Sequence, residues 1–236
     1  MFVTGSATVP RRMASFGSSG TCVQTAFDLA YQARDLSAFV AYIADDDARA
    51  RHVDGNPIIS LEEAAGWDDL GVFIPIHDPS DRRTVFSRVY AAGLPILGAA
   101  GLPHLVHPSA RLGEGVIVQS STRVGPAADL GRGTIVFSDL VAHDVSVGEF
   151  STLAAHSVIL GHVDIGDEVF VGARAVIKNG TAKRPIVIGD GAVIGVGAVV
   201  DRDVAPGEVV VSPRAVSIAE WQAMRSAAKR VRRDVP

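Results

Sequence analysis

Hydrophobic positions follow two different periods along the 236-residue chain, and the period changes near residue 104. Before that point, short apolar runs alternate with stretches in which apolar residues recur at helical spacing. Alternation of this kind predicts parallel strands joined by helices, and hence an α/β, Rossmann-like half-domain over residues 1–103. The expected strands lie at residues 14–16, 39–43, 57–60, 72–76 and 95–97.

Three helices are expected between these strands. The first follows a glycine- and serine-rich turn at residues 17–20. The second should begin after Ser60, because Glu63, three residues later, completes a capping box. The third is expected to begin at a cap on Ser80 and to reach Ala92.

After residue 104 the helical period is lost, and an aliphatic residue followed by glycine recurs instead. Three aliphatic rows run in step and repeat about every 18 residues. A triangular solenoid explains them, because each six-residue side then buries one aliphatic side chain against the coils above and below. A β-sandwich is the alternative, but a sandwich has no reason to keep three rows in phase. The rows are Val106, Val124, Val141, Ile159 and Ile177; Leu112, Leu130, Val147, Ile165 and Ile188; and Val118, Val136, Leu153, Val171 and Ile194.

Two irregularities interrupt the repeat. One residue is missing between Val136 and Val141, and about five are added between Ile177 and Ile188. The rows resume in phase, so residues 179–185, which are rich in turn-forming types, are expected to leave the solenoid as a loop. The β-helix is assigned to residues 104–216, and helical spacing predicts a C-terminal helix within residues 217–236.

Composition narrows the functional classes. Hydrophobic residues make up 47% and charged residues 20%, as in a folded globular chain, and the net charge of −4 argues against a nucleic-acid-binding face. The single cysteine, Cys22, excludes an intramolecular disulfide framework. The sequence has no apolar run of membrane-spanning length and no signal-peptide pattern at its start. We therefore expect a cytoplasmic protein without a membrane partner.

Two neighbouring polar residues in the repeats carry the strongest chemical signal. His143 lies two residues after the inward Val141, so its side chain is expected on an outer surface. An imidazole titrates near neutral pH and can act as a general base, and the adjacent Asp144 can orient it. The alternative is a surface histidine in a subunit contact. In the other half, the turn at residues 17–20 can approach a diphosphate, although it departs from the dinucleotide-binding fingerprint.

Together these features resemble the family of sialic-acid O-acetyltransferases and bacillosamine-type nucleotide-sugar N-acetyltransferases. The resemblance spans residues 14–215 and implies a Rossmann-like half-domain followed by a left-handed parallel β-helix. It also implies a homotrimer that uses acetyl-CoA to acetylate an amino group of a nucleotide-linked amino sugar, by direct attack of the amine on the thioester. Sugar O-acetylation and a non-catalytic β-helix scaffold are the alternatives.

The resemblance also assigns roles to single residues. His143 matches the catalytic base, Asp144 the acidic residue that tunes it, and Gly161 the glycine whose N–H contacts the thioester carbonyl. Thr152 replaces a histidine that contacts acetyl-CoA, and His77 stands where relatives have glycine. Besides Gly161, the positions expected to bind acetyl-CoA are Thr152, Ala173 and Val196. Those expected to bind the nucleotide sugar are Ser19, Gly20, Thr21, Asp45, Asp46 and His77.

Two further hypotheses concern ligands. Lys183 and Arg184, in the predicted loop, can pair with the 3′-phosphate and diphosphate of CoA. A zinc centre would need His143, His156 and His162 to gather across a subunit interface, as in β-helix carbonic anhydrases. Their spacing departs from that family, so no metal is expected.

Overall fold

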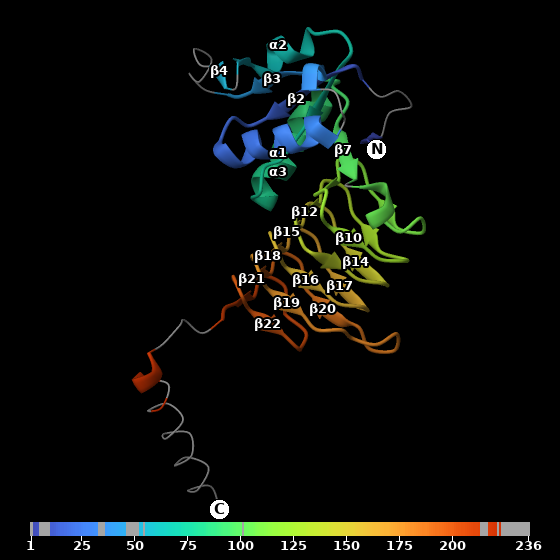
Figure 1. Cartoon of the computed structure of the whole chain (residues 1–236), viewed down its shortest axis with the longest axis vertical. Coiled ribbons are helices and arrows are strands. Elements are labelled where there is room, and N and C mark those ends of the chain that lie inside the picture. The colour runs from blue at the N-terminus through green and yellow to red at the C-terminus, as the bar shows by residue number, and fades with distance from the viewer. Residues whose placement is uncertain are drawn as a thin grey trace, which may run out of the picture.

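Three parallel sheets form the C-terminal half of the chain, and each follows one of the aliphatic rows. The computed structural model describes residues 2–4, 10–32, 36–45, 52–53, 55–100, 102–212, 217–220 and 222. The coils stack on one another in successive layers (Figure 1). Val124 pairs with Val141, and Val141 pairs with Ile159, so each coil places its inward side chain on that of the coil before it. This confirms the register predicted from the sequence.

The strands of the solenoid are two or three residues long, as hexapeptide sides require. One sheet also takes up two strands from the N-terminal part of the chain, β1 (Phe2–Thr4) and β7 (Leu97–Ala100). It continues with β9 (Ile117–Val118), β12 (Ile135–Val136), β15 (Thr152–Leu153), β18 (Phe170–Val171), β21 (Val193–Ile194) and β23 (Val209–Val210). The second sheet contains β10 (Arg123–Val124), β13 (Leu140–Val141), β16 (Val158–Ile159), β19 (Val176–Ile177) and β22 (Val199–Val200). The third contains β8 (Arg111–Leu112), β11 (Asp129–Leu130), β14 (Val145–Val147), β17 (Val163–Ile165) and β20 (Ile186–Ile188).

Small aliphatic side chains fill the inside of the solenoid. Leu130, Val141 and Ile159 are fully buried there. Coils approach so closely at the corners that a methyl group on Gly148 would lie 2.5 Å from the backbone carbon of Gly166. Glycine therefore recurs after the inward aliphatic residue because no side chain fits between successive coils.

Both predicted irregularities are present. The coil that contains Val136 and Val141 is one residue short but stays in register with its neighbours. After Ile177 the added residues leave the solenoid, and the chain returns in register at β20. Paired backbone hydrogen bonds between Thr181 and Arg184, of 2.9 and 3.0 Å, close this loop, which projects from the solenoid in Figure 1.

An α/β domain precedes the solenoid. Its five strands have the order β4-β5-β3-β2-β6, and all pairs are parallel except β4 with β5. The predicted strand at residues 39–43 and the capping box of Ser60 and Glu63 are confirmed. The strands are β2 (Arg12–Phe16), β3 (Phe39–Ile43), β4 (His52–Val53), β5 (Asn56–Ile59) and β6 (Leu70–Phe73). The helices are α1 (Gly20–Gln32), α2 (Leu61–Ala65) and α3 (Pro79–Ala91), with 3-10 turns at Leu36–Ala38 and Pro103–Leu105.

Two local predictions in this half need correction. Helix α3 is capped by Asp78 and not by Ser80: the Asp78 carboxylate accepts the Asp81 N–H at 2.9 Å, and Pro79 occupies the first helical position. The strand expected at residues 95–97 forms at Leu97–Ala100, where it pairs with β1 and β9. It therefore enters a solenoid sheet, and only an isolated bridge between Val72 and Ile96 links it to β6.

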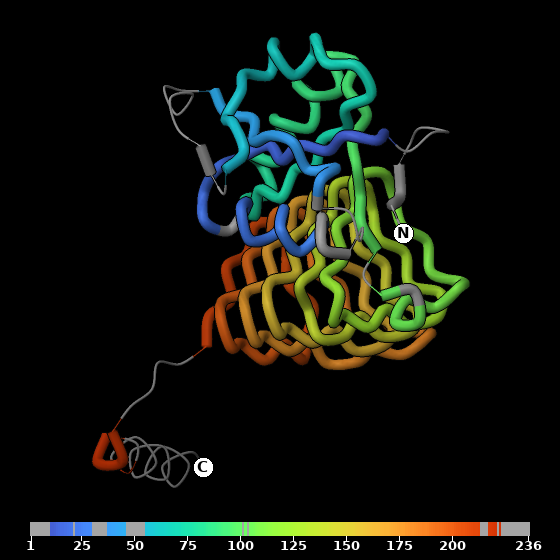
Figure 2. Tube along the Cα trace, turned by 45° about the horizontal axis from the view of Figure 1, so that its top comes forward, coloured from blue at the N-terminus to red at the C-terminus, as the bar shows by residue number. Residues whose placement is uncertain are grey.

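The α/β domain packs directly on the first coils of the solenoid (Figure 2). Leu29 of α1 shares a buried cluster with Ile117 and Ile135, which lie on the outer face of β9 and β12. Phe86 of α3 meets Phe150 at a corner of the solenoid, with ring centroids 5.2 Å apart. One face and one corner of the solenoid are thus covered.

The predicted C-terminal helix lies largely outside the described residues. Residues 218–220 and 222 are helical, and Ser217 and Glu220 form a reciprocal cap, with N–H to oxygen distances of 2.7 and 3.2 Å. Among the described helices, none is long and apolar enough to cross a membrane.

Candidate active site

His143 and Asp144 occupy one corner of the solenoid, between β13 and β14. His143 Nδ1 lies 2.8 Å from Asp144 Oδ2, and about half of each side chain is exposed. A carboxylate only accepts hydrogen bonds, so Nδ1 must carry the proton, and Nε2 then holds a free lone pair. The pair therefore has a fixed tautomer whose free nitrogen can accept a proton, and it is open to solvent.

Gly161 lies directly beneath the His143 ring, one coil further along. A methyl group on Gly161 would approach His143 Cε1 to 2.6 Å and Nε2 to 2.7 Å. The absent side chain is what allows the imidazole to lie flat on this coil. Among the described residues the Gly161 N–H has no hydrogen-bond partner, so it is available to a ligand beside the base.

His162 adds a second imidazole to the same corner. Its ring stands at 85° to that of His143, with centroids 5.1 Å apart, and its Nδ1 lies 3.9 Å from Asp144 Oδ2. His156 instead pairs with Asp139 at 3.0 Å on a different corner. Within one protomer, then, the three histidines of the zinc hypothesis do not gather, because Nδ1 of His156 is directed at a carboxylate of its own corner.

Thr152 requires a correction, since its side chain is fully buried. The hydroxyl donates to the carbonyl of His77 at 2.8 Å, beneath the α/β domain. It is therefore unavailable to acetyl-CoA. Ala173 and Val196 lie on the corner that also carries His156, and Val196 is well exposed.

Lys183 and Arg184 lie in the projecting loop, on the same corner as His143. The base of the loop is tied to the coil next to that of His143: the Gly180 N–H donates to Gly161 O at 3.0 Å, and the Ile186 N–H donates to His162 O at 3.2 Å. A cavity of about 550 Å³ opens beside it and is lined by the cationic residues Lys178, Arg184 and Arg202 and by the acidic residues Asp201 and Asp203.

A second cavity, of about 490 Å³, brings together residues predicted to bind the nucleotide sugar. Ser19, Asp45 and His77 line it, and they follow the carboxyl ends of β2, β3 and β6. Gly20 and Thr21 form the first turn of α1, next to Ser19, whereas Asp46 lies outside the described residues. Asp45 is held by both guanidinium nitrogens of Arg88, at 2.5 and 2.6 Å.

His77 is held firmly at the inner end of this cavity. Its carbonyl accepts hydrogen bonds from Thr152 and Arg82, and its ring packs against Phe137 at 5.1 Å. Its Nε2 is buried and has no partner among the described residues. Burial, and then the positive charge of Arg82, lower the pKa of His77, so the ring is neutral at physiological pH.

Arg82 joins the two domains and was not found from the sequence. Its side chain is fully buried and donates to carbonyls of Ile76 and His77 and to carbonyls of two successive coils at one solenoid corner. Those at the corner belong to Gly133, Phe150 and Ser151. Burial lowers the pKa of Arg82 to about 9, and Asp78 and Glu168 counteract only part of this effect, so the guanidinium stays charged at neutral pH. The helix that carries Arg82 is rich in polar residues, so the sequence does not indicate that this arginine is buried between the two domains.

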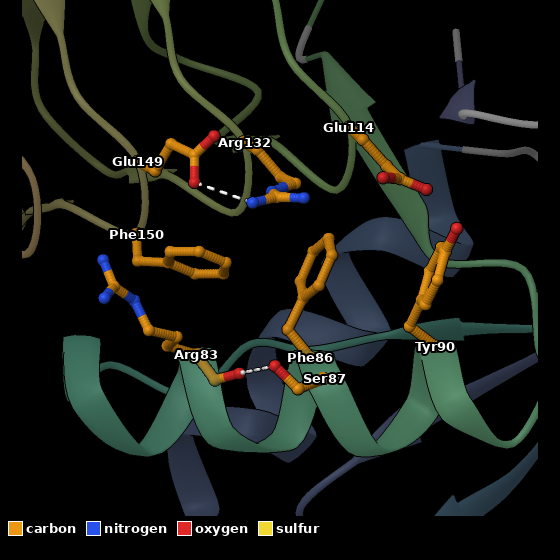
Figure 3. Close-up of a pocket in the computed structure, with 8 residues that line it drawn as sticks. All are labelled: Arg83, Phe86, Ser87, Tyr90, Glu114, Arg132, Glu149 and Phe150. Atoms are coloured by element: carbon orange, nitrogen blue, oxygen red, sulfur yellow. Dashed lines mark hydrogen bonds and ion pairs between the residues drawn. The ribbon is translucent and has the colours of Figure 1, made fainter.

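A third cavity, of about 460 Å³, lies between α3 and the solenoid corner (Figure 3). Phe86 and Phe150 form its wall, with Arg132 stacked near both rings. Arg132 pairs with Glu149 at 2.8 Å and Arg83 pairs with Glu168 at 2.6 Å, so both cations are neutralised. It contains none of the predicted site residues.

A histidine–carboxylate base on a hexapeptide solenoid, beside an α/β domain with a polar cavity, defines the class of acyltransferases built on a parallel β-helix. The family model described as "Hexapeptide repeat of succinyl-transferase" matches residues 162–202. GDP-perosamine N-acetyltransferase of Escherichia coli O157:H7 is 36% identical over 159 residues, which cover 66% of this chain and 72% of that protein.

Solved structures agree with this class. WeeI from Acinetobacter baumannii AYE superposes with a TM-score of 0.76 at 26% identity, over 85% of this chain and 96% of that one. A histidine mutant of perosamine N-acetyltransferase from Caulobacter crescentus, in complex with CoA and GDP-perosamine, has the same fold, with a TM-score of 0.76 at 23% identity over 85% and 93% of the two chains. The solenoid is thus a left-handed parallel β-helix. The chain belongs to the hexapeptide-repeat family of perosamine- and bacillosamine-type nucleotide-sugar N-acetyltransferases, which confirms the resemblance found in the sequence.

Proposed function

We propose that this enzyme transfers the acetyl group of acetyl-CoA to an amino group of a nucleotide-linked amino sugar, with His143 as general base. The observation that carries the proposal is the His143–Asp144 pair, 2.8 Å apart on an open corner, with Gly161 beneath the ring. Relatives named as N-acetyltransferases, one of them bound to CoA and GDP-perosamine, support the substrate class.

The proposed reaction needs no enzyme nucleophile. The amine nitrogen attacks the thioester carbonyl carbon, and its proton moves to Nε2 of His143 as the new C–N bond forms. Asp144 keeps the proton on Nδ1 and stabilises the resulting imidazolium. The Gly161 N–H, which has no hydrogen-bond partner among the described residues, would stabilise the oxyanion. The C–S bond then breaks, and the CoA thiolate leaves and takes the proton from the imidazolium.

The α/β domain, which we interpret as Rossmann-like, would hold the nucleotide part of the acceptor. Three features of the 490 Å³ cavity support this: it opens at the carboxyl ends of parallel strands, it lies beside the N-terminus of α1, and it is lined by His77, whose Nε2 has no partner in the described part of the chain. Strand ends and helix N-termini of this kind are where α/β sheets bind phosphorylated ligands.

We also propose that the enzyme is a homotrimer. The acceptor cavity borders the sheet of β12 and β15, through Phe137 and Thr152, whereas His143 lies at the corner between the other two sheets. An acceptor bound in one protomer would therefore meet the base of a neighbour. The outward row of Leu140, Val158, Val176 and the 72%-exposed Val199 offers an apolar contact surface. Light scattering should give a trimeric mass, and a monomer would contradict this arrangement.

We propose that Lys183 and Arg184 contact the phosphates of CoA, because the base of their loop is hydrogen-bonded to Gly161 and His162, beside the proposed base His143. The double substitution Lys183→Ala/Arg184→Ala should raise the KM for acetyl-CoA several-fold. The effect should be smaller with an analogue that lacks the 3′-phosphate. Arg111→Ala, an exposed cation in strand β8, far along the chain from the loop, is the matched control. Unchanged KM values for both donors would refute the contact.

The assignment of the base is tested by alanine substitution. His143→Ala should lower turnover by about 10²–10⁴-fold, the usual contribution of a general base, with little effect on acceptor binding. Asp144→Asn should cost less, because the imidazole remains. His156→Ala removes a similar histidine–carboxylate pair on another corner and serves as control. Near-normal turnover of His143→Ala, with loss in His156→Ala or His162→Ala, would overturn the assignment.

A further inference from the structure

One cluster of side chains in the described part of the chain has the donor set of a transition-metal site. The ligand atoms of His143, Asp144 and His162 all lie within 4.8 Å of one another. Nδ1 of His143 is 2.8 Å and Nδ1 of His162 is 3.9 Å from the same oxygen, Oδ2 of Asp144. We propose that these three residues bind Zn²⁺ or a similar ion, and that the bound ion inhibits acetyl transfer.

The chemistry of the donors selects the metal. Two imidazole nitrogens and one carboxylate oxygen suit Zn²⁺, Co²⁺ and Ni²⁺, whereas Mg²⁺ and Ca²⁺ require mostly oxygen ligands. With metal–ligand distances of about 2.0–2.1 Å, ligands of a tetrahedral ion lie roughly 3.3 Å apart. The two distances to Oδ2 bracket that value, and each differs from it by about half an ångström.

The backbone holds the three residues in place while leaving the site open. The His162 N–H donates to the carbonyl of His143 at 3.3 Å, so the two coils are tied together at this corner. Asp144 and His162 both adopt left-handed backbone conformations, with φ of 54° and 57°. Side-chain exposures of 53%, 51% and 27% leave room for water at a fourth position. Three protein ligands with one open position is also the arrangement of catalytic zinc centres in enzymes.

The inhibitory effect follows from the proton on His143. Without a metal, Asp144 holds the proton on Nδ1, and Nε2 is the acceptor. A metal ion on Nδ1 takes that lone pair, so the single proton of the neutral ring must move to Nε2. Nε2 can then no longer accept a proton from the amine, and Asp144 no longer stabilises an imidazolium. Occupation of the site removes the base without any change of fold; this step rests on the proposed function.

Metal binding can be measured independently of activity. Untagged protein would be titrated with Co²⁺, whose visible absorption reports nitrogen and oxygen ligands, and then with Zn²⁺ by calorimetry. We expect one ion per chain, and at least tenfold weaker binding in His162→Gln. His156→Gln is the matched control, because His156 has only one carboxylate partner and belongs to no cluster of three donors among the described residues. No binding, or equal affinity in the wild type and His162→Gln, would overturn the site.

Initial rates then test inhibition, before the thiol product competes for zinc. Zn²⁺ should inhibit the wild type, excess chelator should restore the full rate, and Mg²⁺ should have no effect. The rate of each variant is expressed relative to the rate of the same variant in excess chelator. The zinc concentration that gives half-inhibition should rise at least tenfold in His162→Gln but should not change in His156→Gln. Full activity with the site saturated would refute inhibition. An enzyme inactive on all nucleotide amino sugars would refute the proposed function, while the Co²⁺ titration would still decide the site.

Discussion

Replacing the buried Arg82 by methionine is the most demanding test of how the two domains are joined. Arg82 is 1% exposed, and its guanidinium donates to five carbonyls, two in the loop that precedes α3 and three in the solenoid. Methionine has a similar length and fills most of the same space but donates no hydrogen bond. Arg82→Met therefore removes the donors with little change in packing.

The magnitude follows from counting the carbonyls that lose their donor. The carbonyl of His77 keeps the Thr152 hydroxyl, and that of Ser151 keeps the Ile135 N–H. The remaining three have only Arg82 as a partner among the described residues. An unsatisfied buried carbonyl costs about 1–3 kcal/mol, and we take the low end because the desolvation cost of the charge disappears too. We expect a loss of about 3 kcal/mol.

Thermal unfolding and steady-state kinetics measure the two consequences. A loss of about 3 kcal/mol corresponds to a Tm lower by roughly 6–12 °C in a chain of this size. The KM for the acceptor should rise while that for acetyl-CoA stays the same, because the released loop carries His77 at the acceptor cavity. Arg82→Lys keeps three N–H donors, so its Tm and its KM for the acceptor should lie between those of the wild type and Arg82→Met.

The control is Arg83→Met on the same helix, which removes a partly exposed pair with Glu168 and a cation–π contact with Phe150. Such a pair contributes at most about 1 kcal/mol. If Arg82→Met melted within about 2 °C of Arg83→Met, the carbonyl count would be wrong. If Arg82→Met lost stability but kept the wild-type KM for the acceptor, Arg82 would join the two domains without positioning the residues of the acceptor cavity.

Two more substitutions probe the sites separately. Gly161→Ala should lower kcat at least tenfold, because the methyl group would displace the His143 ring that lies 2.6 Å away. Gly66→Ala, whose methyl group would meet nothing closer than 3.4 Å, should keep the rate, and equal losses would contradict the proposed packing. Burial lowers the pKa of His77 in the folded state below 6.5. The unfolded state therefore binds the proton more readily, and the free energy of unfolding falls as the pH drops from 6.5 through the folded-state pKa. His77→Gln should therefore flatten the dependence of Tm on pH between about 7 and 5, and an unchanged slope would refute this linkage.

Much of the solenoid could be predicted because its tertiary contacts repeat in the sequence. Each inward side chain packs on its counterpart one coil away, so Val141 between Val124 and Ile159 is already visible as a periodic row. The His143–Asp144 pair could also be predicted, because the two residues are adjacent in the sequence and lie at one corner. The limits of the domains, set at residues 103 and 216, remain a prediction.

The sequence by itself therefore determined the local and periodic features: the coil register, the loop at residues 179–185, the capping box at Ser60 and the pairing of His143 with Asp144. Only the tertiary structure decided which faces are covered and how side chains are turned. Thr152 is buried because the α/β domain sits on its strand, and Arg82 reaches carbonyls up to 69 residues away. His162 turns its ring toward His143. These contacts join segments that share no period, so no pattern along the chain could reveal them.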